Sequence, residues 1–182
     1  MNYPFSAVAT NVLGSTKFSY PMLDGNRRRE VVFDFEGPFK RIEYLTTIQA
    51  VLSGLSGVRK ELPTPEELFA DLPETREYIR SLEPGILEPF RDLSCARLLD
   101  KLFSKLVEPT LMDPTFVLDH PLADSPLAKE HREKPFIAER FELFVGGQEL
   151  VNAYTEQNDP EVQREHFRRQ QQGSNSIANY WL

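Results

Sequence analysis

Two stretches rich in β-branched and aromatic residues open the chain, with a turn signal between them. They are residues 16–20 and residues 31–35, and Asp24-Gly25 lies between them. Such runs around a turn dipeptide are typical of a β-hairpin. Further along, residues 42–55 carry apolar side chains at near-helical spacing. The first part of the chain therefore predicts a mostly extended segment followed by a helix.

The middle of the chain has a helical and initially acidic pattern that prolines divide into short pieces. Its clearest helix follows Ser94 and ends at Glu108-Pro109, since a residue before proline disfavours the helical region. One face of this helix is apolar and is formed by Leu98, Leu99, Leu102, Phe103, Leu106 and Val107. Such a stripe predicts a helix that packs against a core.

The last third of the chain predicts a buried strand, a tight hairpin and a surface helix. Residues 115–118 are the strand candidate, and residues 141–145 and 148–154 flank Gly146-Gly147. Two glycines between β-like runs favour a primed turn, which requires positive φ. The surface helix begins at Asp159-Pro160, an N-cap followed by a proline at the first helical position.

Composition narrows the class of protein. The 182 residues are 40% hydrophobic and 27% charged, which suits one domain and excludes a disordered chain or a membrane protein. The net charge of −7 is unlike that of a free-standing nucleic-acid binder. The lone Cys95 excludes a disulfide framework and a multi-cysteine zinc site, and indicates a reducing compartment. Residues 1–5 show neither a signal peptide nor a transit peptide pattern.

Two acidic residues on the predicted hairpin are candidates for metal binding. With a two-residue turn, Glu142 faces Val151, and Glu149 lies diagonal to Glu142 on the same face, with Cβ atoms roughly 7–8 Å apart. Two carboxylates at that separation favour a divalent cation such as Mg²⁺, which binds one or two carboxylates plus substrate phosphates. The alternative is that both carboxylates lie on a solvated face.

The second strand of the hairpin carries a polar row. Asn152, Tyr154 and Glu156 alternate along the sequence and share one face of an ideal strand. A carboxylate, an aromatic ring and an amide together can bind a polar cation. A polar edge strand explains the same pattern.

Several longer motifs resemble a known family. They are residues 113–121, 125–129, 139–144 and 149–160, supported by residues 35–42 and 96–102. In combination they closely resemble class II lysyl-tRNA synthetases. The resemblance covers about residues 7–172, as a partial catalytic domain, and leaves residues 173–182 as an irregular tail.

The resemblance implies a fold and a set of site residues. The expected fold is α+β, a partial class II catalytic core in which helices flank an antiparallel sheet on one side. Glu142 and Glu149 would hold magnesium and, through it, ATP. Asn152, Tyr154 and Glu156 would bind lysine, with Glu156 facing the ammonium group. An ideal strand would place these two sets on opposite faces, so we expect a β-bulge or strong twist between Glu149 and Asn152. No residue is assigned as general acid or base.

The resemblance also implies what the whole enzyme does and what this chain lacks. The family's signature motifs 1, 2 and 3 and its anticodon-binding domain have no counterpart in these 182 residues. The full enzyme would be a homodimeric lysine-tRNA ligase that uses ATP and magnesium to charge tRNA(Lys). It would work in the cytoplasm or, alternatively, in mitochondria, without a membrane partner. We expect the isolated chain to have little activity and poor solubility. A non-catalytic paralogue that serves as an interaction module is the alternative.

Overall fold

Two sheets and a set of short helices organise the protein. The structure is a computed structural model that describes residues 3–24, 27–57 and 59–172. The helices are α1 (Tyr3–Leu13), α2 (Tyr44–Ser56), α3 (Pro65–Ala70), α4 (Pro73–Leu82), α5 (Pro84–Leu87), α6 (Cys95–Leu102) and α7 (Pro160–Gln172). The strands are β1 (Lys17–Asp24), β2 (Arg27–Asp34), β3 (Lys40–Glu43), β4 (Thr115–Leu118), β5 (Arg140–Val145) and β6 (Gln148–Tyr154). The predicted α+β class is confirmed.

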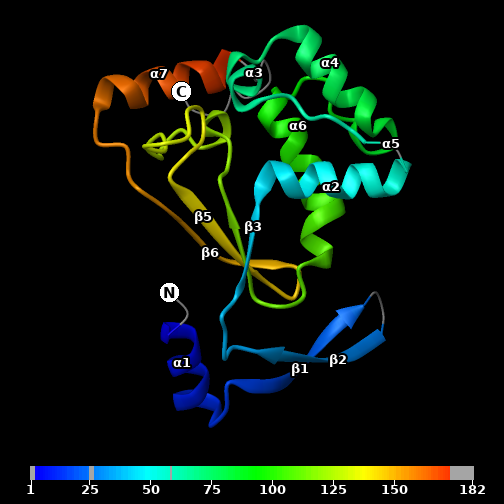
Figure 1. Ribbon diagram of the computed structural model, residues 1–182, viewed down its shortest axis with the longest axis vertical. Coiled ribbons are helices and arrows are strands. Elements are labelled where there is room, and N and C mark those ends of the chain that lie inside the picture. The colour runs from blue at the N-terminus through cyan, green and yellow to red at the C-terminus, as the bar shows by residue number, and fades with distance from the viewer. Residues whose placement is uncertain (1–2, 25–26, 58, 173–182) are drawn as a thin grey trace, which may run out of the picture.

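The larger sheet has the order β3-β4-β5-β6 (Figure 1). Strands β4, β5 and β6 are antiparallel neighbours, whereas β3 runs parallel to β4. A parallel pair needs a crossover connection, and the helices from α2 to α6 provide it. The helix predicted over residues 42–55 therefore begins two residues later, at Tyr44, because residues 40–43 pair with β4.

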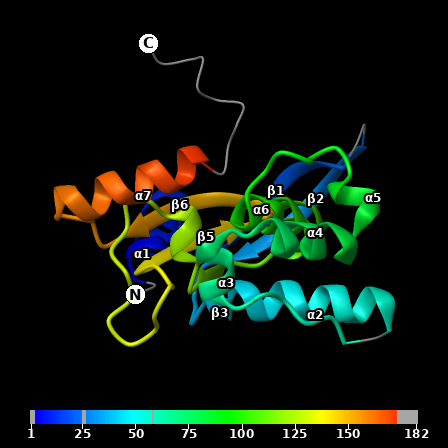
Figure 2. The same cartoon turned by 90° about the horizontal axis from the view of Figure 1, so that it is seen from above.

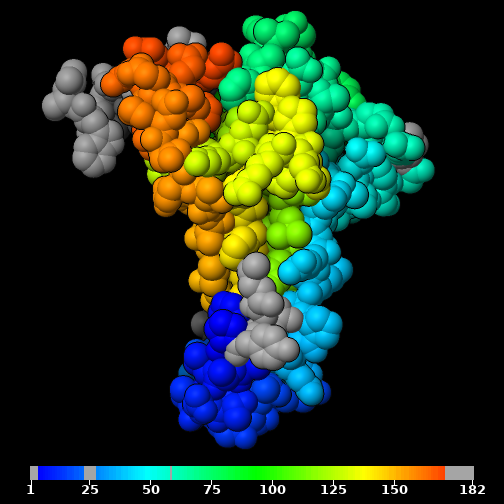
Figure 3. All heavy atoms as spheres, turned by 60° about the vertical axis from the view of Figure 1, so that its left-hand side comes forward, coloured from blue at the N-terminus to red at the C-terminus, as the bar shows by residue number. Residues whose placement is uncertain are grey.

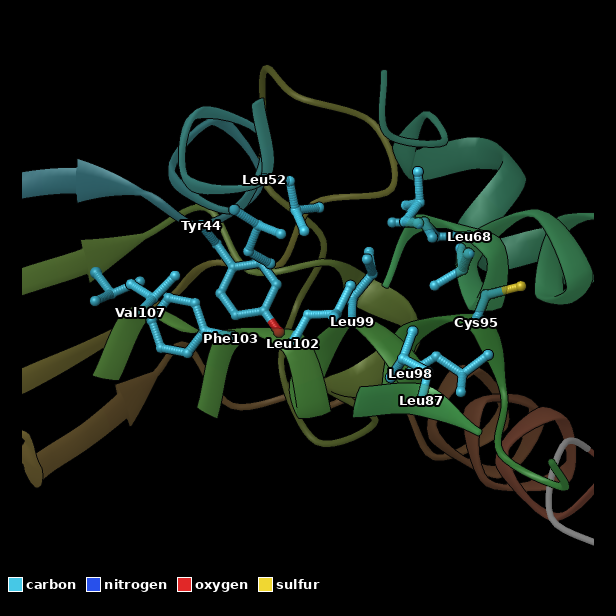
Figure 4. Close-up of a cluster of buried hydrophobic side chains, with 14 of the residues drawn as sticks. Tyr44, Leu52, Leu68, Leu87, Cys95, Leu98, Leu99, Leu102, Phe103 and Val107 are labelled. Carbon is cyan, nitrogen blue, oxygen red and sulfur yellow. The ribbon is translucent and has the colours of Figure 1, made fainter. Parts of the chain in front are cut away.

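One face of this sheet is covered by the helical core. The apolar stripe predicted after Ser94 is confirmed: α6 continues into a π-helical turn, Phe103–Val107, and the Ser94 hydroxyl accepts a hydrogen bond from the backbone of Arg97. Figure 4 shows these side chains meeting Tyr44 and Leu52 of α2. The rings of Tyr44 and Phe103 stack with centroids 4.7 Å apart. Val117 of β4 and Phe144 of β5 project from this face of the sheet and belong to the same buried cluster.

Apolar residues on the opposite face of the sheet pack against an arm made of α1, β1 and β2. The predicted hairpin is confirmed, with a regular antiparallel ladder from Lys17↔Asp34 to Asp24↔Arg27. Phenylalanines of the arm and of the sheet form a second cluster, which also contains Ala9, Leu143 and Val145. The arm forms a lobe at one end of the molecule (Figures 1 and 3).

The helix α1 corrects two expectations. The first part of the chain is not mostly extended, since α1 occupies residues 3–13, and helices do not lie on one side of the sheet alone. Phe5 and Ala9, one helical turn apart, pack into the phenylalanine cluster, and the Ser6 hydroxyl donates to the Phe35 carbonyl. Tertiary contacts therefore stabilise a helix whose sequence pattern is weak.

The C-terminal helix follows its prediction. The Asp159 carboxylate accepts hydrogen bonds from the backbone N–H groups of Glu161 and Val162, at 2.9 and 3.3 Å. In the view from above, α7 and α2 lie far apart with strands between them (Figure 2). The irregular tail expected over residues 173–182 lies outside the described residues. Within the described ranges, no helix is long and apolar enough to cross a membrane.

Candidate functional site

The β5–β6 hairpin is held by its turn and by the segment before β4. Gly146 and Gly147 both have positive φ, 62° and 72°, as the predicted primed turn requires. Their N–H groups donate to the carbonyls of Met112 and Leu111 at 2.8 and 2.9 Å. The turn is therefore fixed to the body of the protein at both glycines.

The pairing of the two strands contains the expected irregularity. Val145 pairs with Gln148 and Phe144 with Glu149, but Leu143 pairs with Val151, which leaves Leu150 as an extra residue. The predicted β-bulge between Glu149 and Asn152 is thus confirmed. The predicted pairing of Glu142 with Val151 is wrong, because the bulge shifts the register by one residue.

The bulge brings the candidate residues of the hairpin to one face. Glu142 now lies directly opposite Asn152, and Tyr154 lies opposite Arg140. Alternation along β5 puts Arg140, Glu142 and Phe144 on the same face, which is the face of the helical core. Glu149, opposite Phe144, joins them. The resemblance requires this facing of the residues that are expected to bind the ion and lysine.

Glu142 is a buried carboxylate with a dense set of partners. Its side chain is 8% exposed and contacts the Arg140 guanidinium, with Nη2 to Oε1 at 2.5 Å. The amide Nδ2 of Asn152 donates to the same oxygen at 3.2 Å. Burial raises the pKa of Glu142 to about 7; Arg140 opposes this shift and Glu149 adds to it. The carboxylate is therefore poised to gain from a further positive charge.

His120 borders the same carboxylate. Its Nε2 lies 3.7 Å from Glu142 Oε2 and has no hydrogen-bond partner among the described residues. Burial, together with the nearby charge of Arg140, lowers the pKa of His120 to about 3, so the imidazole is neutral. His120 also packs against Tyr44, with ring centroids 4.9 Å apart, and so connects the site to the helical core.

Glu142 and Glu149 could together hold a magnesium ion if water molecules or phosphate oxygens supply its other ligands. Glu142 and Glu149 share a face, and the negative charge of Glu149 helps to raise the pKa of Glu142. In the part of the chain that the structure describes, no cluster of three or more histidine, cysteine or acidic side chains could enclose a metal ion. Magnesium does not need such an enclosure, since it commonly uses one or two carboxylates plus phosphate oxygens.

A cavity of about 160 Å³ opens beside these residues. Asn152, Tyr154 and Arg140 line it together with the segment 124–128. Tyr154 also packs against a small buried cluster of Leu122, Ala128 and Ala138. Two of the three residues expected to bind lysine therefore meet at one cavity.

Glu156 lies beyond the end of β6 and is exposed. Its backbone bridges to Ala128, while the neighbouring Thr155 and Gln157 make hydrogen bonds to Lys129 and Leu127. Glu156 is not among the residues that line the cavity. Its carboxylate has no ion-pair partner within the described ranges, so it remains available to a cation.

Sequence reasoning missed two members of this site, Arg140 and His120. Arg140 belongs to the resembling motifs, and its spacing of two residues from Glu142 could have placed both side chains on one face. His120 had no such signal, because its contact with Glu142 arises where the loop after β4 meets β5.

Comparison with known proteins identifies the family. Residues 5–181 match the family described as tRNA synthetases class II (D, K and N). A lysine--tRNA ligase of Saccharolobus solfataricus is 38% identical over 168 residues, 91% of this chain and 29% of that protein. A probable cytoplasmic lysine--tRNA ligase of Encephalitozoon cuniculi is 42% identical over 176 residues, 94% of this chain and 32% of that protein.

A third relative agrees with these two. A lysine--tRNA ligase of Deinococcus radiodurans is 39% identical over 166 residues, 91% of this chain and 27% of that protein. The chain spans about a third or less of the length of these curated relatives. The family match covers nearly all of the 182 residues, and the chain belongs to the class II tRNA synthetases of the aspartate, lysine and asparagine group.

Proposed function

We propose that this chain forms the lysine-binding and metal-binding part of a lysine-tRNA ligase. The full enzyme would activate lysine with ATP and magnesium and transfer it to tRNA(Lys). The observation that carries the proposal is the bulge at Leu150, which puts Glu142, Glu149 and Asn152 on one face beside a cavity. The names of the relatives support lysine as the amino acid.

Each side chain has a role that follows from its chemistry. Glu142 and Glu149 would hold magnesium, which when bound offsets the negative charge of the ATP phosphates. The amide of Asn152 and the ring of Tyr154 would position the amino acid in the cavity. Glu156 would accept the ammonium group of the lysine side chain at the cavity's edge, since its carboxylate has no other cation among the described residues. We assign no general acid or base.

The remaining expectations extend this proposal to the whole enzyme. The full protein would be a homodimer. It would work in the cytoplasm, the compartment in the name of the Encephalitozoon relative. Mitochondria are the alternative compartment. The isolated chain should bind lysine weakly and show little aminoacylation, because groups that stabilise developing charge on the α-phosphate each contribute on the order of 10²–10³ in rate.

Isothermal titration with lysine and with norleucine, which lacks the ammonium group, tests the proposal. The chain should bind lysine at least ~10-fold more tightly, because a charged hydrogen bond contributes about 1.5–3 kcal/mol. Glu156→Gln should remove that preference, whereas the control Glu133→Gln, an exposed acid away from the cavity, should keep it. Equal binding of the two ligands, or none, would contradict the proposal.

A non-catalytic interaction module is the second candidate. Exposed apolar side chains on the arm favour it, namely Val8, Val12, Leu13, Tyr20 and Val32. A concentration of large exposed apolar residues in one part of a protein often marks an interaction surface. A chain that is a monodisperse, cooperatively melting monomer and binds neither lysine nor ATP would favour this second candidate.

A further inference from the structure

Arg140 contacts several residues of the candidate site, but the function proposed above gives it no role. Its Nε donates to Asn152 Oδ1 at 3.1 Å, and its Nη2 donates to Glu142 Oε1 at 2.5 Å. Its Nη1 donates to the Ser125 hydroxyl at 3.0 Å and to the Asp124 carbonyl at 3.2 Å. One guanidinium group thus joins β5, β6 and the segment between β4 and β5.

These contacts fix which way the Asn152 amide points. Arg140 can only donate hydrogen bonds, and an ionised Glu142 can only accept them. Asn152 Oδ1 accepts from Arg140, and Asn152 Nδ2 donates to Glu142 at 3.2 Å. A flipped amide would place N–H against N–H and oxygen against oxygen. The amide therefore has one favoured orientation, with one N–H and one lone pair left for a guest.

The same contacts hold the Glu142 carboxylate in place. Arg140 and Asn152 both donate to Oε1, so the two contacts occupy one carboxylate oxygen. The Arg140 side chain is 16% exposed and is itself anchored by Ser125, which is buried. A largely buried and anchored donor loses little further freedom when a ligand arrives.

We propose that Arg140 is a positioning residue of the lysine site, which orients the Asn152 amide toward the cavity and holds Glu142 beside it. This inference rests on the proposed function. A lysine side chain at position 140 cannot take over this role. Its single ammonium nitrogen lacks the planar set of donors with which a guanidinium group contacts three segments at once. The positive charge alone is therefore insufficient, and the shape of the donor group matters.

A double-mutant cycle on the full chain separates positioning from general support of the fold. Arg140→Lys should weaken lysine binding ~10-fold by calorimetry, whereas on an Asn152→Ala background the same substitution should weaken it less than ~2-fold. An equal loss on both backgrounds would overturn the inference, since Arg140 would then not act through Asn152. Arg132→Lys is the matched control, because Arg132 is 83% exposed and pairs only with Glu139 among the described residues.

A second variant leaves Arg140 itself unchanged. Ser125→Ala removes one anchor of the guanidinium group and leaves Asn152, Tyr154 and Glu156 unaltered, although Ser125 itself lines the cavity. Lysine binding should weaken about 2–4-fold, consistent with the loss of one modest hydrogen bond. Unchanged affinity in a folded Ser125→Ala chain would contradict the idea that the anchoring of Arg140 matters.

An NMR measurement decides the inference even if lysine does not bind. In the ligand-free chain, the Asn152 amide proton that is hydrogen-bonded to Glu142 should exchange ~10-fold more slowly than the side-chain amide protons of Asn158, which make no hydrogen bond among the described residues. Arg140→Lys should bring the Asn152 rate to that of Asn158, and Arg132→Lys should not. If the unaltered chain fails to bind lysine, the proposed function fails, whereas an Asn152 rate unaffected by Arg140→Lys overturns the inference.

Discussion

The two hairpins of this protein differ by a single extra residue. The β1–β2 ladder is regular over all eight pairs, from Lys17↔Asp34 to Asp24↔Arg27. The β5–β6 ladder contains the extra Leu150, so residues on either side of it change their facing. The regular hairpin packs as part of the arm, whereas the bulged hairpin gathers charged and amide groups on one face.

The contrast shows what a bulge provides beyond local twist. In a regular strand, residues 149 and 152 point to opposite faces, because their separation is odd. The bulge removes that constraint without a longer loop, so the residues proposed to bind the ion and the amino acid share one face. Bulges are enriched next to active sites for this reason.

The largest effect should come from the core beneath the bulged hairpin. Phe144→Ala should lower the free energy of unfolding by about 3–5 kcal/mol, because the ring is 1% exposed and packs against Phe103. Phe33→Ala, in the regular hairpin, should mainly loosen the arm. Hydrogen exchange with urea unfolding distinguishes them: Phe33→Ala should speed exchange in α1, β1 and β2, while protection of α6 is retained. A similar loss across both regions would show that the arm and body unfold together.

The next effect is a pH dependence that only the bulged hairpin should show. The pKa of Glu142 is raised from 4.5 to about 7 by burial, so the folded state holds this proton more tightly. The stability that it contributes is present below pH 4.5 and is lost as the pH rises through 7. Compared with the unaltered chain, Glu142→Gln should therefore gain stability between pH 4 and pH 8, by up to about 3 kcal/mol.

His120 has the opposite pH dependence and provides the control. Its pKa falls from 6.5 to about 3, so its contribution is present above pH 6.5 and is lost as the pH falls through 3. The two pH dependences oppose each other where their ranges overlap, between pH 4.5 and pH 6.5, and His120→Gln should expose the Glu142 effect alone. Denaturant unfolding across this pH range measures the contributions of both groups.

Millimolar magnesium at pH 8 should stabilise the unaltered chain but not Glu142→Gln. Stabilisation of Glu142→Gln and not of the unaltered chain would contradict the proposed ion-binding role.

A smaller effect is expected at the turn of the bulged hairpin. Gly147→Ala should lower stability by about 1–2 kcal/mol, because its φ of 72° is strained for alanine and the new Cβ would lie 3.2 Å from the Glu108 carbonyl oxygen. Gly54→Ala is the matched control. Gly54 lies within α2, and a Cβ there meets no atom within 4 Å, so this substitution should instead stabilise by up to about 1 kcal/mol. Thermal melts should show a lower melting temperature for Gly147→Ala and a higher one for Gly54→Ala.

The smallest effect should follow deletion of Leu150. Without the extra residue, Phe144 still pairs with Glu149 and Glu142 with Asn152, so a regular ladder reproduces the same facing. Because Leu150 is 52% exposed, the deletion should change stability by less than about 1 kcal/mol. Contacts between the Glu142 and Asn152 side chains, seen by NMR, should persist. Their loss would mean that the bend of the bulge, and not the register alone, shapes the site.

Local patterns predicted the hairpins, the helix after Ser94 and the cap at Asp159, since each depends on neighbouring residues. The need for a bulge followed from combining the resemblance with strand alternation. The contacts of Arg140 could not be predicted, because they join residues 12 to 16 positions apart through the fold. The helix α1 was missed because its stability depends on the phenylalanine cluster.

The diglycine turn lies against both halves of the molecule at once. A Cβ at Gly146 would lie 3.0 Å from Phe33 and 3.1 Å from the Met22 sulfur, while Gly147 approaches the backbone of Glu108. The closed end of the site hairpin is thus clamped between the arm and the body. The open end is held separately, since Thr155 and Gln157 make backbone hydrogen bonds to Lys129 and Leu127. A guest that enters beside Tyr154 therefore meets strands that are braced at both ends before it arrives.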